Sequence, residues 1–138
     1  MTSYIVPTMK RRSDLLPRPT EGELELLGVL WEKGPATVRD LHQEIHSRRD
    51  VGYTSVLKLL QIMTEKGLVE REEAGKAHIY RAAASQQETQ NQLLRDMSAR
   101  LFAGSAAQLA LHALALEPVN DRELEELRHL IEKKRKRP

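Results

Sequence analysis

Apolar residues recur every three or four positions through the first half of this 138-residue chain, and that spacing is typical of amphipathic helices. Three such stripes span about residues 20–33, 37–47 and 54–66. Their apolar members are Leu24, Leu27, Leu30 and Trp31, then Val38, Leu41 and Ile45, then Val56, Leu59, Leu60 and Met63. We expect the three helices to share one core, with Trp31 as its largest member.

Start and stop signals delimit these helices. The first opens on a capping box, Thr20-x-x-Glu23, and breaks at Gly34-Pro35. Thr37 can cap the second helix. The third is expected to start at the hydroxyl pair Thr54-Ser55 and to end at Gly67.

A hairpin is predicted after the third helix. Leu68-Val69 and Ile79-Tyr80 flank the polar segment EREEAGKAH, whose turn we place at Ala74-Gly75-Lys76. Three helices followed by two strands are the layout of a winged helix-turn-helix, in which the third helix is the recognition helix and the hairpin is the wing. The sequence therefore predicts a mainly α fold with a small β-wing over residues 19–83.

Residues 84–134 predict three further amphipathic helices. Capping boxes begin at Ser85 and Asn120, and breaks fall at Gly104 and Pro118. A helical region this short cannot easily bury its Leu-rich stripes within one copy of the chain. We therefore expect it to form the dimerisation domain of a homodimer. Folding back onto the first domain is the alternative. The expected interface residues are Leu94, Met97, Leu101, Leu109, Leu124, Leu127 and Ile131.

Charge is concentrated at the two ends, although the formal net charge is only +2. Residues 1–18 form a basic leader that includes Lys10, Arg11 and Arg12, and residues 135–138 form a basic tail. Basic arms are attracted to polyanions, although a run of like charges is often only a solvated tail.

The chain contains no cysteine, which excludes disulfides, thiolate metal sites and thiol redox sensing. Its longest apolar stretch, about residues 109–116, is interrupted by His112 and is too short to span a bilayer. The N-terminus lacks the apolar core of a signal peptide. These features predict a cytoplasmic protein with no membrane insertion.

The predicted recognition helix and wing make double-stranded DNA the expected partner. An α-helix fits the major groove, and its N-terminal residues reach base edges when a preceding helix braces it across the backbone. The first free amides of the helix can hold a phosphate, and the wing lies near the backbone or the minor groove. The expected DNA-binding residues are Tyr53, Thr54, Ser55, Lys58, Lys76 and His78, with Arg11 and Arg12 of the leader.

The residues leave two other functions open. Winged helices also serve as protein-interaction modules, and the segment Glu70–Glu73 makes the first wing strand acidic. His42 and His46 lie four apart, a spacing that can present two imidazoles to a metal ion. The zinc-protease motif, however, needs Glu directly after its first His, and Gln43 stands there. We expect no metal, no cofactor and no catalytic residue.

Two stretches carry a family resemblance. TEGELELLGVLWEKGPATVRDLHQEI and YTSVLKLLQIMTEKGLVEREEAGKAHIY, followed by three helices, resemble the penicillinase-repressor family of the BlaI/MecI type, which also includes the CopY copper repressors. The resemblance covers about residues 19–134. It implies a bacterial transcriptional repressor that sits as a dimer on a palindromic operator and blocks transcription, for example of antibiotic-resistance or cell-envelope stress genes. By position, Thr54, Ser55 and Lys58 match the DNA-contacting face of the family's recognition helix, and Gly75-Lys76 matches its Gly-Arg wing tip.

The chain departs from the family pattern at several positions. Lys58 stands where the family often has Thr, and Ile62 where it usually has Arg, so the operator is expected to differ from the family's TACA/TGTA half-sites. The CopY metal-binding tail is rich in cysteine, which this chain lacks. In β-lactam-responsive members, a membrane sensor-protease pathway leads to cleavage at an Asn-Phe bond. The matching stretch here, Leu111-His112-Ala113, has His112-Ala113 in place of that pair, so the sequence does not predict cleavage at this position. The leader is longer than the family's usual start.

Overall fold

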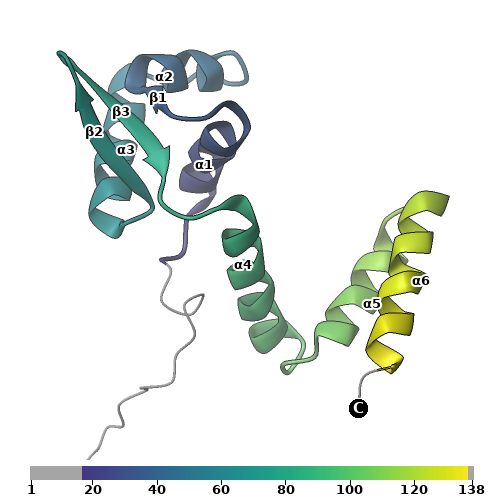
Figure 1. The fold of residues 1–138 in the computed structure, drawn as a ribbon. Helices are drawn as coiled ribbons and strands as arrows, with labels where there is room; N and C mark the ends of the chain where they lie inside the picture. The colour runs from purple at the N-terminus through teal and green to yellow at the C-terminus, as the bar shows by residue number, and fades with distance from the viewer. Residues whose placement is uncertain (1–16, 137–138) are drawn as a thin grey trace, which may run out of the picture. The chain divides into compact units, whose positions relative to one another are not determined.

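The computed structural model describes residues 17–136, which form six helices and three short strands (Figure 1). The helices are α1 (Glu21–Lys33), α2 (Val38–His46), α3 (Tyr53–Lys66), α4 (Gln86–Leu101), α5 (Ala106–Leu116) and α6 (Asp121–Arg135). The strands are β1 (Ala36–Thr37), β2 (Val69–Ala74) and β3 (Ala77–Ala82). The mainly α fold with a small β-wing is confirmed.

The chain divides into two compact units within α4, between Leu93 and Leu94. The sequence places the domain boundary earlier, between residues 83 and 84. Helix α4 therefore belongs to both units, its first half to the unit that contains the sheet and its second half to the unit of α5 and α6.

The caps predicted from the sequence form in the first unit. At the start of α1, the Thr20 hydroxyl accepts from the Glu23 amide while the Glu23 carboxylate accepts from the Thr20 amide. Thr37 and Asp40 make the same reciprocal pair at the start of α2. These pairs satisfy amides that the first helical turn leaves without partners. Local side-chain chemistry therefore sets where both helices begin.

The sheet is antiparallel with strand order β1-β3-β2. Ala74 pairs with Ala77 at the end of the hairpin, so only Gly75 and Lys76 form the turn. The three-residue turn predicted from the sequence is thus one residue too long. Gly75 has a φ of +64°, which suits the two-residue hairpin turns that place Gly at their first position. Strand β1 is too short for its alternation to be visible in the sequence, and it was not predicted.

The core of the first unit lies between α1, α2, α3 and the sheet. Leu41, Leu60 and Met63 are fully buried, and Tyr80 of β3 is the largest fully buried side chain. The expectation that Trp31 is the largest core residue is wrong, because Trp31 is only half-buried and packs against the edge of the core. Its indole N–H donates to the Ala84 carbonyl at 3.0 Å, a contact that holds the ring at this edge.

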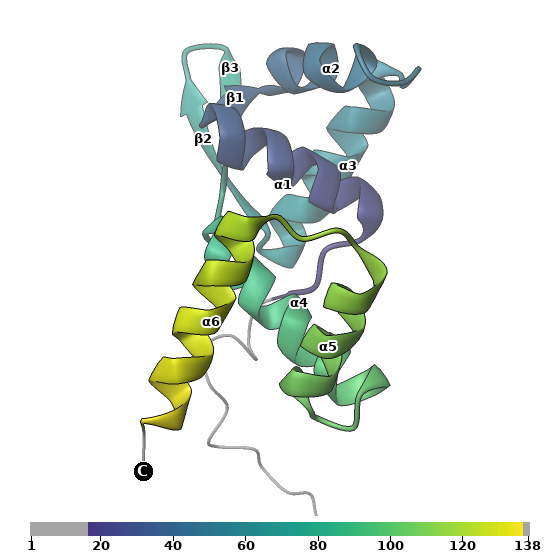
Figure 2. The same cartoon turned by 90° about the vertical axis from the view of Figure 1, so that its right-hand side faces the viewer.

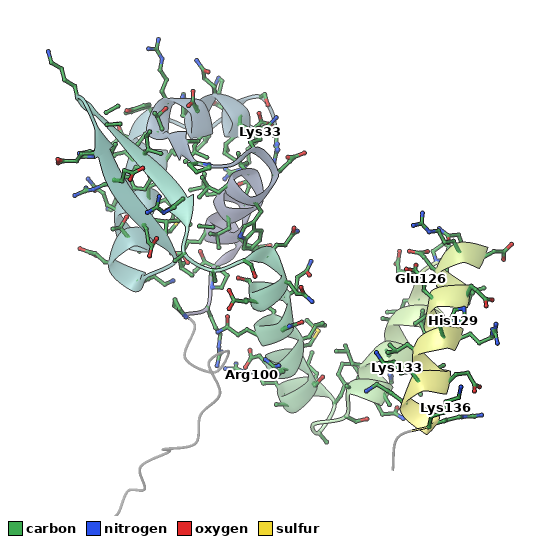
Figure 3. The ribbon with its side chains drawn as sticks, in the orientation of Figure 1. Lys33, Arg100, Glu126, His129, Lys133 and Lys136 are labelled. Atoms are coloured by element: carbon green, nitrogen blue, oxygen red, sulfur yellow. The ribbon has the colours of Figure 1, made fainter. Side chains whose placement is uncertain are left out.

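Helices α5 and α6 contain no buried residue. They stand apart from each other in Figure 2, and Figure 3 shows Glu126, His129 and Lys133 following one another along α6, with Lys136 just after its end. Several apolar side chains of this second unit are exposed. They are Leu94, Met97, Leu101, Leu111, Leu114, Leu116, Leu124, Leu130 and Ile131. Leu109 and Leu127 are half-buried.

Candidate nucleic-acid interface

The helix-turn-helix is formed by α2, the segment 47–52 and α3. Helix α3 begins at Tyr53 with Gly52 as its N-cap, and no side chain caps it. The expected start at Thr54-Ser55 is therefore one residue late, because these hydroxyls lie inside the first turn and do not cap the helix. Both hydroxyl side chains are exposed, and the first amides of α3 remain available to a ligand.

The core-facing side of α3 is set by Val56, Leu60 and Met63, which are buried. Leu59, expected to be buried with them, is half-buried, and so is Leu57, which the predicted apolar stripe does not include. Both pack against the edge of the core. The apolar side of α3 is therefore wider than the sequence stripe indicates.

The opposite side of α3 presents polar groups to solvent. Tyr53, Thr54, Ser55, Lys58 and Gln61 are all exposed there. Within residues 17–136, no carboxylate forms an ion pair with Lys58, so none of these residues neutralises its charge. This side combines hydroxyl, amide and ammonium donors, which are groups that contact bases and phosphates in DNA grooves.

The wing carries both signs of charge. Lys76 lies at its turn, is exposed and has no carboxylate partner among the described residues. Behind the turn, Arg81 contacts Glu70 at 3.2 Å and Glu72 at 3.7 Å. His78 lies 3.9 Å from Glu73, so protonation of the ring would create a further pair. Arg81 of β3 thus partly neutralises the carboxylates of β2. The ammonium group of Lys76 remains exposed at the turn of the wing.

Two arginines of the segment between α2 and α3 are held by carboxylates. Arg48 bonds Glu44 at 3.1 Å, and Arg49 bonds Glu25 of α1 through two nitrogens, at 2.8 and 3.2 Å. The hydrogen bonds to Glu25 raise the pKa of Arg49, with a further contribution from the charge of Glu25. These guanidinium groups fix the turn against α1 and α2 and are less available to phosphates than Lys58 is.

Within the described part of the chain, the two histidines of α2 are not members of a metal-binding group. No group of three or more His, Asp and Glu side chains within residues 17–136 is placed to hold a metal ion. His42 and His46 instead contact the carbonyl of Val51, just before α3. Apart from the spacing of the pair, no sequence pattern predicts this contact, because it depends on how the chain turns after α2.

The remaining predicted DNA-binding residues, Arg11 and Arg12, lie outside the residues that the structure describes. The other six all belong to α3 or to the wing of the first unit. They are Tyr53, Thr54, Ser55, Lys58, Lys76 and His78. Gln61, which also faces solvent on α3, is absent from that predicted set although its spacing from Lys58 places it on the same side.

Comparison with known proteins identifies the family to which this chain belongs. The sequence profile of the family described as Penicillinase repressor matches residues 19–133. The chain belongs to the penicillinase repressor family. Members of this BlaI/MecI-type family are DNA-binding transcriptional repressors, and the resemblance noted from the sequence is confirmed.

Individual relatives of this penicillinase repressor family member are distant. The methicillin resistance regulatory protein MecI of Mammaliicoccus sciuri is 23% identical over 115 residues, which is 83% of this chain and 94% of that protein. The transcriptional regulator BlaI of Mycobacterium tuberculosis is 33% identical over 93 residues, or 65% of this chain and 67% of that protein. A solution structure of the DNA-binding domain of the repressor BlaI aligns with a TM-score of 0.49 and 18% identity, covering 58% of this chain and 93% of that one.

Among the described residues, no single helix has both the length and the apolar character needed to cross a membrane. Helices α4 and α5 meet those criteria of length and composition only when they are taken together, as a pair bent at the break between them.

Proposed function

We propose that this penicillinase repressor family member binds a palindromic operator as a homodimer and blocks transcription by occupying it. The observation that carries the proposal is the outer side of α3. There, exposed hydroxyls and Lys58, which has no ion-pair partner among the described residues, follow a helix start that no side chain caps. Such a helix end offers amides and a positive dipole to phosphates, and its side chains can enter the major groove.

Each predicted contact has a proposed role. Thr54, Ser55 and Lys58 read base edges or clamp the backbone in the major groove, and Tyr53 contacts a phosphate at the start of the helix. Lys76 and His78 of the wing contact the adjacent backbone or minor groove. Arg11 and Arg12 of the leader add phosphate contacts.

Dimerisation is proposed for the second unit. Its α5 and α6 bury no residue, and side chains such as Leu94 and Leu124, about half exposed at 52% and 50%, give an apolar surface that water covers in one copy. Burial of that apolar surface between two copies would stabilise their association. A two-fold dimer would present two recognition helices to half-sites about one helical turn, or a multiple of it, apart.

Release from the operator is proposed to follow a membrane sensor-protease pathway, as the family resemblance implies, with antibiotic-resistance or cell-envelope stress genes as targets. The stretch matching the family's cleavage bond, Leu111-His112-Ala113, is exposed but lies within α5. A protease needs an extended segment, so cleavage at this place requires α5 to unfold locally first.

The proposal is tested by fluorescence anisotropy of the purified protein on duplexes tiled across the region upstream of its own gene. Scrambled duplexes of the same composition are the control, and each titration is repeated at several salt concentrations. We expect one dimer to bind one palindromic duplex selectively. Weak binding that is equal on all duplexes and is abolished by moderate salt would overturn the proposal and favour a protein-interaction module, because it would reflect the basic arms alone.

A further inference from the structure

Two histidine rings of α2 converge on one backbone oxygen. His42 Nε2 lies 2.9 Å from the carbonyl oxygen of Val51, and His46 Nδ1 lies 3.3 Å from the same atom. The rings are neighbours on the helix, with centroids 5.3 Å apart. The carbonyl belongs to the segment between α2 and α3, two residues before the recognition helix begins.

A carbonyl oxygen only accepts hydrogen bonds, so each facing nitrogen must carry its proton. His42 is therefore protonated at Nε2 and His46 at Nδ1, which makes the two neutral rings opposite tautomers. A carbonyl oxygen has two lone pairs, so it can accept from both rings together. The arrangement is a double clamp, which we define as the pair of contacts from His42 and His46 to the Val51 carbonyl.

The double clamp continues into α3. The ring of Tyr53, the first residue of α3, lies edge-on to His42 with centroids 5.7 Å apart. His42 therefore contacts both the segment that precedes the recognition helix and the first side chain of that helix. Helix α3 has no side-chain cap of its own. The contacts of His42 and His46 therefore hold the start of α3 in place, as a capping side chain does in other helices.

We propose that His42 and His46 are positioning residues for DNA recognition: through Val51 and Tyr53 they fix the direction in which α3 starts. This inference rests on the proposed function, because it assigns the histidines a role in how α3 meets DNA. A helix whose start is free to shift presents its base-contacting groups in several positions, and ordering them on binding lowers affinity.

The charged groups around the double clamp leave its donors in place. Asp50 lies 3.9 Å from His46 Nδ1. His46 is the last residue of α2. Arg48 is paired with Glu44, and Arg49 with Glu25. Protonation of either ring adds a proton to its far nitrogen, so both donors to Val51 persist.

The tautomers can be read directly from side-chain ¹⁵N chemical shifts, recorded at a pH where the rings are neutral. We expect the Nε2–H form for His42 and the Nδ1–H form for His46. His112, whose Nδ1 faces the Gln108 carbonyl at 2.9 Å, serves as an internal reference for the second form. Assignments come from single His→Gln variants. The Nε2–H form in both rings of α2, or rapid averaging of the two forms, would overturn the double clamp without any reference to DNA.

Amide substitutions test the role in binding. The amide nitrogen of Gln can take the place of Nε2, and that of Asn the place of Nδ1. His42→Gln and His46→Asn should therefore keep operator affinity within about twofold, whereas His42→Asn and His46→Gln should weaken it by about three- to tenfold, the equivalent of losing one hydrogen bond. Gln43→Asn, an exposed site on the same helix, is the matched control and should change nothing.

The outcomes separate the two proposals. Selective operator binding by the wild type, with the same affinity in all four histidine variants, would overturn the positioning role while the proposed function stands. Absence of selective binding by the wild type would overturn the proposed function, and the positioning role with it. Thermal unfolding of each variant identifies any substitution that acts by unfolding the domain. The Gln and Asn forms at one position differ by a single methylene, so a general loss of stability would affect both and not one alone.

Discussion

Lys66 at the end of α3 places its Nζ 2.7 Å from Oε1 of Glu23 in the first turn of α1. The Glu23 side chain is only 2% exposed, and the same oxygen accepts from the Thr20 amide at 2.8 Å. One carboxylate thus completes the cap of α1 and binds the far end of the recognition helix. A buried carboxylate requires such partners, because burial removes the water molecules that stabilise its charge and other groups must replace them.

Removal of the ammonium group should destabilise the domain. Lys66→Met keeps most of the aliphatic stem but leaves the Glu23 carboxylate with the Thr20 amide and hydroxyl as its partners. We expect a loss of about 2 kcal/mol, below the 3–5 kcal/mol typical of fully buried pairs because the Lys66 side chain is 33% exposed. Urea unfolding followed by the fluorescence of Trp31 measures the change.

A neutral partner should recover part of that loss. In Lys66→Met combined with Glu23→Gln, no charge is buried and the amide oxygen can still accept from Thr20. The double variant is therefore expected to be more stable than Lys66→Met alone. If the two had equal stability, the pairing of these charges would not be what the single substitution removes.

Stability should fall in acid because of Glu23. Burial by itself raises the pKa of this carboxyl, but the hydrogen bond from Lys66, the Thr20 amide and hydroxyl, and the charge of Lys66 together outweigh it and lower the pKa. A carboxyl whose pKa is lower in the folded state stabilises the fold above its unfolded pKa, and that contribution disappears as the pH falls through the folded pKa. We expect the free energy of unfolding to decrease over that acidic range. In Glu23→Gln the decrease should be smaller, and an equal decrease in both proteins would assign the effect to other groups.

Loss of Lys58 should weaken DNA binding and reduce its salt dependence. A lysine that neutralises one phosphate releases counterions on binding, so Lys58→Ala should lower the slope of log affinity against log salt by about 1. Lys33→Ala is the matched control, because this exposed lysine at the end of α1 lies 3.8 Å from Glu44 and has its own partner (Figure 3). Anisotropy titrations at four salt concentrations give both slopes. An unchanged slope in Lys58→Ala would remove this side of α3 from the DNA interface.

A charge on the exposed apolar side of α4 should separate the proposed dimer. Leu94→Glu changes a side chain that is already half exposed, so the fold of one copy should tolerate it, whereas an interface would bury the charge without a partner. Sedimentation should show monomers, with much weaker operator binding. Ala99→Glu is the control. Ala99 is two residues from both Met97 and Leu101, so its side chain lies on a different side of α4. A tight dimer in Leu94→Glu would place the interface elsewhere.

Features determined by neighbouring residues could be predicted from the sequence. The capping pairs Thr20–Glu23 and Thr37–Asp40 form where their spacing indicates, and the positive φ of Gly67, +81°, ends α3 at the expected residue. Such contacts lie within one helical turn, so their geometry follows from the local sequence. The same holds for the outward side of α3, where Lys58 and its neighbours are exposed because the opposite side is apolar.

Only the tertiary structure decided which distant groups meet. Trp31 packs against the edge of the core, whereas Tyr80 is fully buried within it, and the sequence predicted Trp31 as the largest core residue. The contact between Glu23 and Lys66 joins residues 43 positions apart, and the approach of His42 to Val51 depends on the path of the turn after α2. The sequence by itself determined the helices, the wing and the polar side of the recognition helix, because short-range periodicity encodes them. The partners of buried charges and ring nitrogens depend on how those elements pack, and no local pattern encodes that.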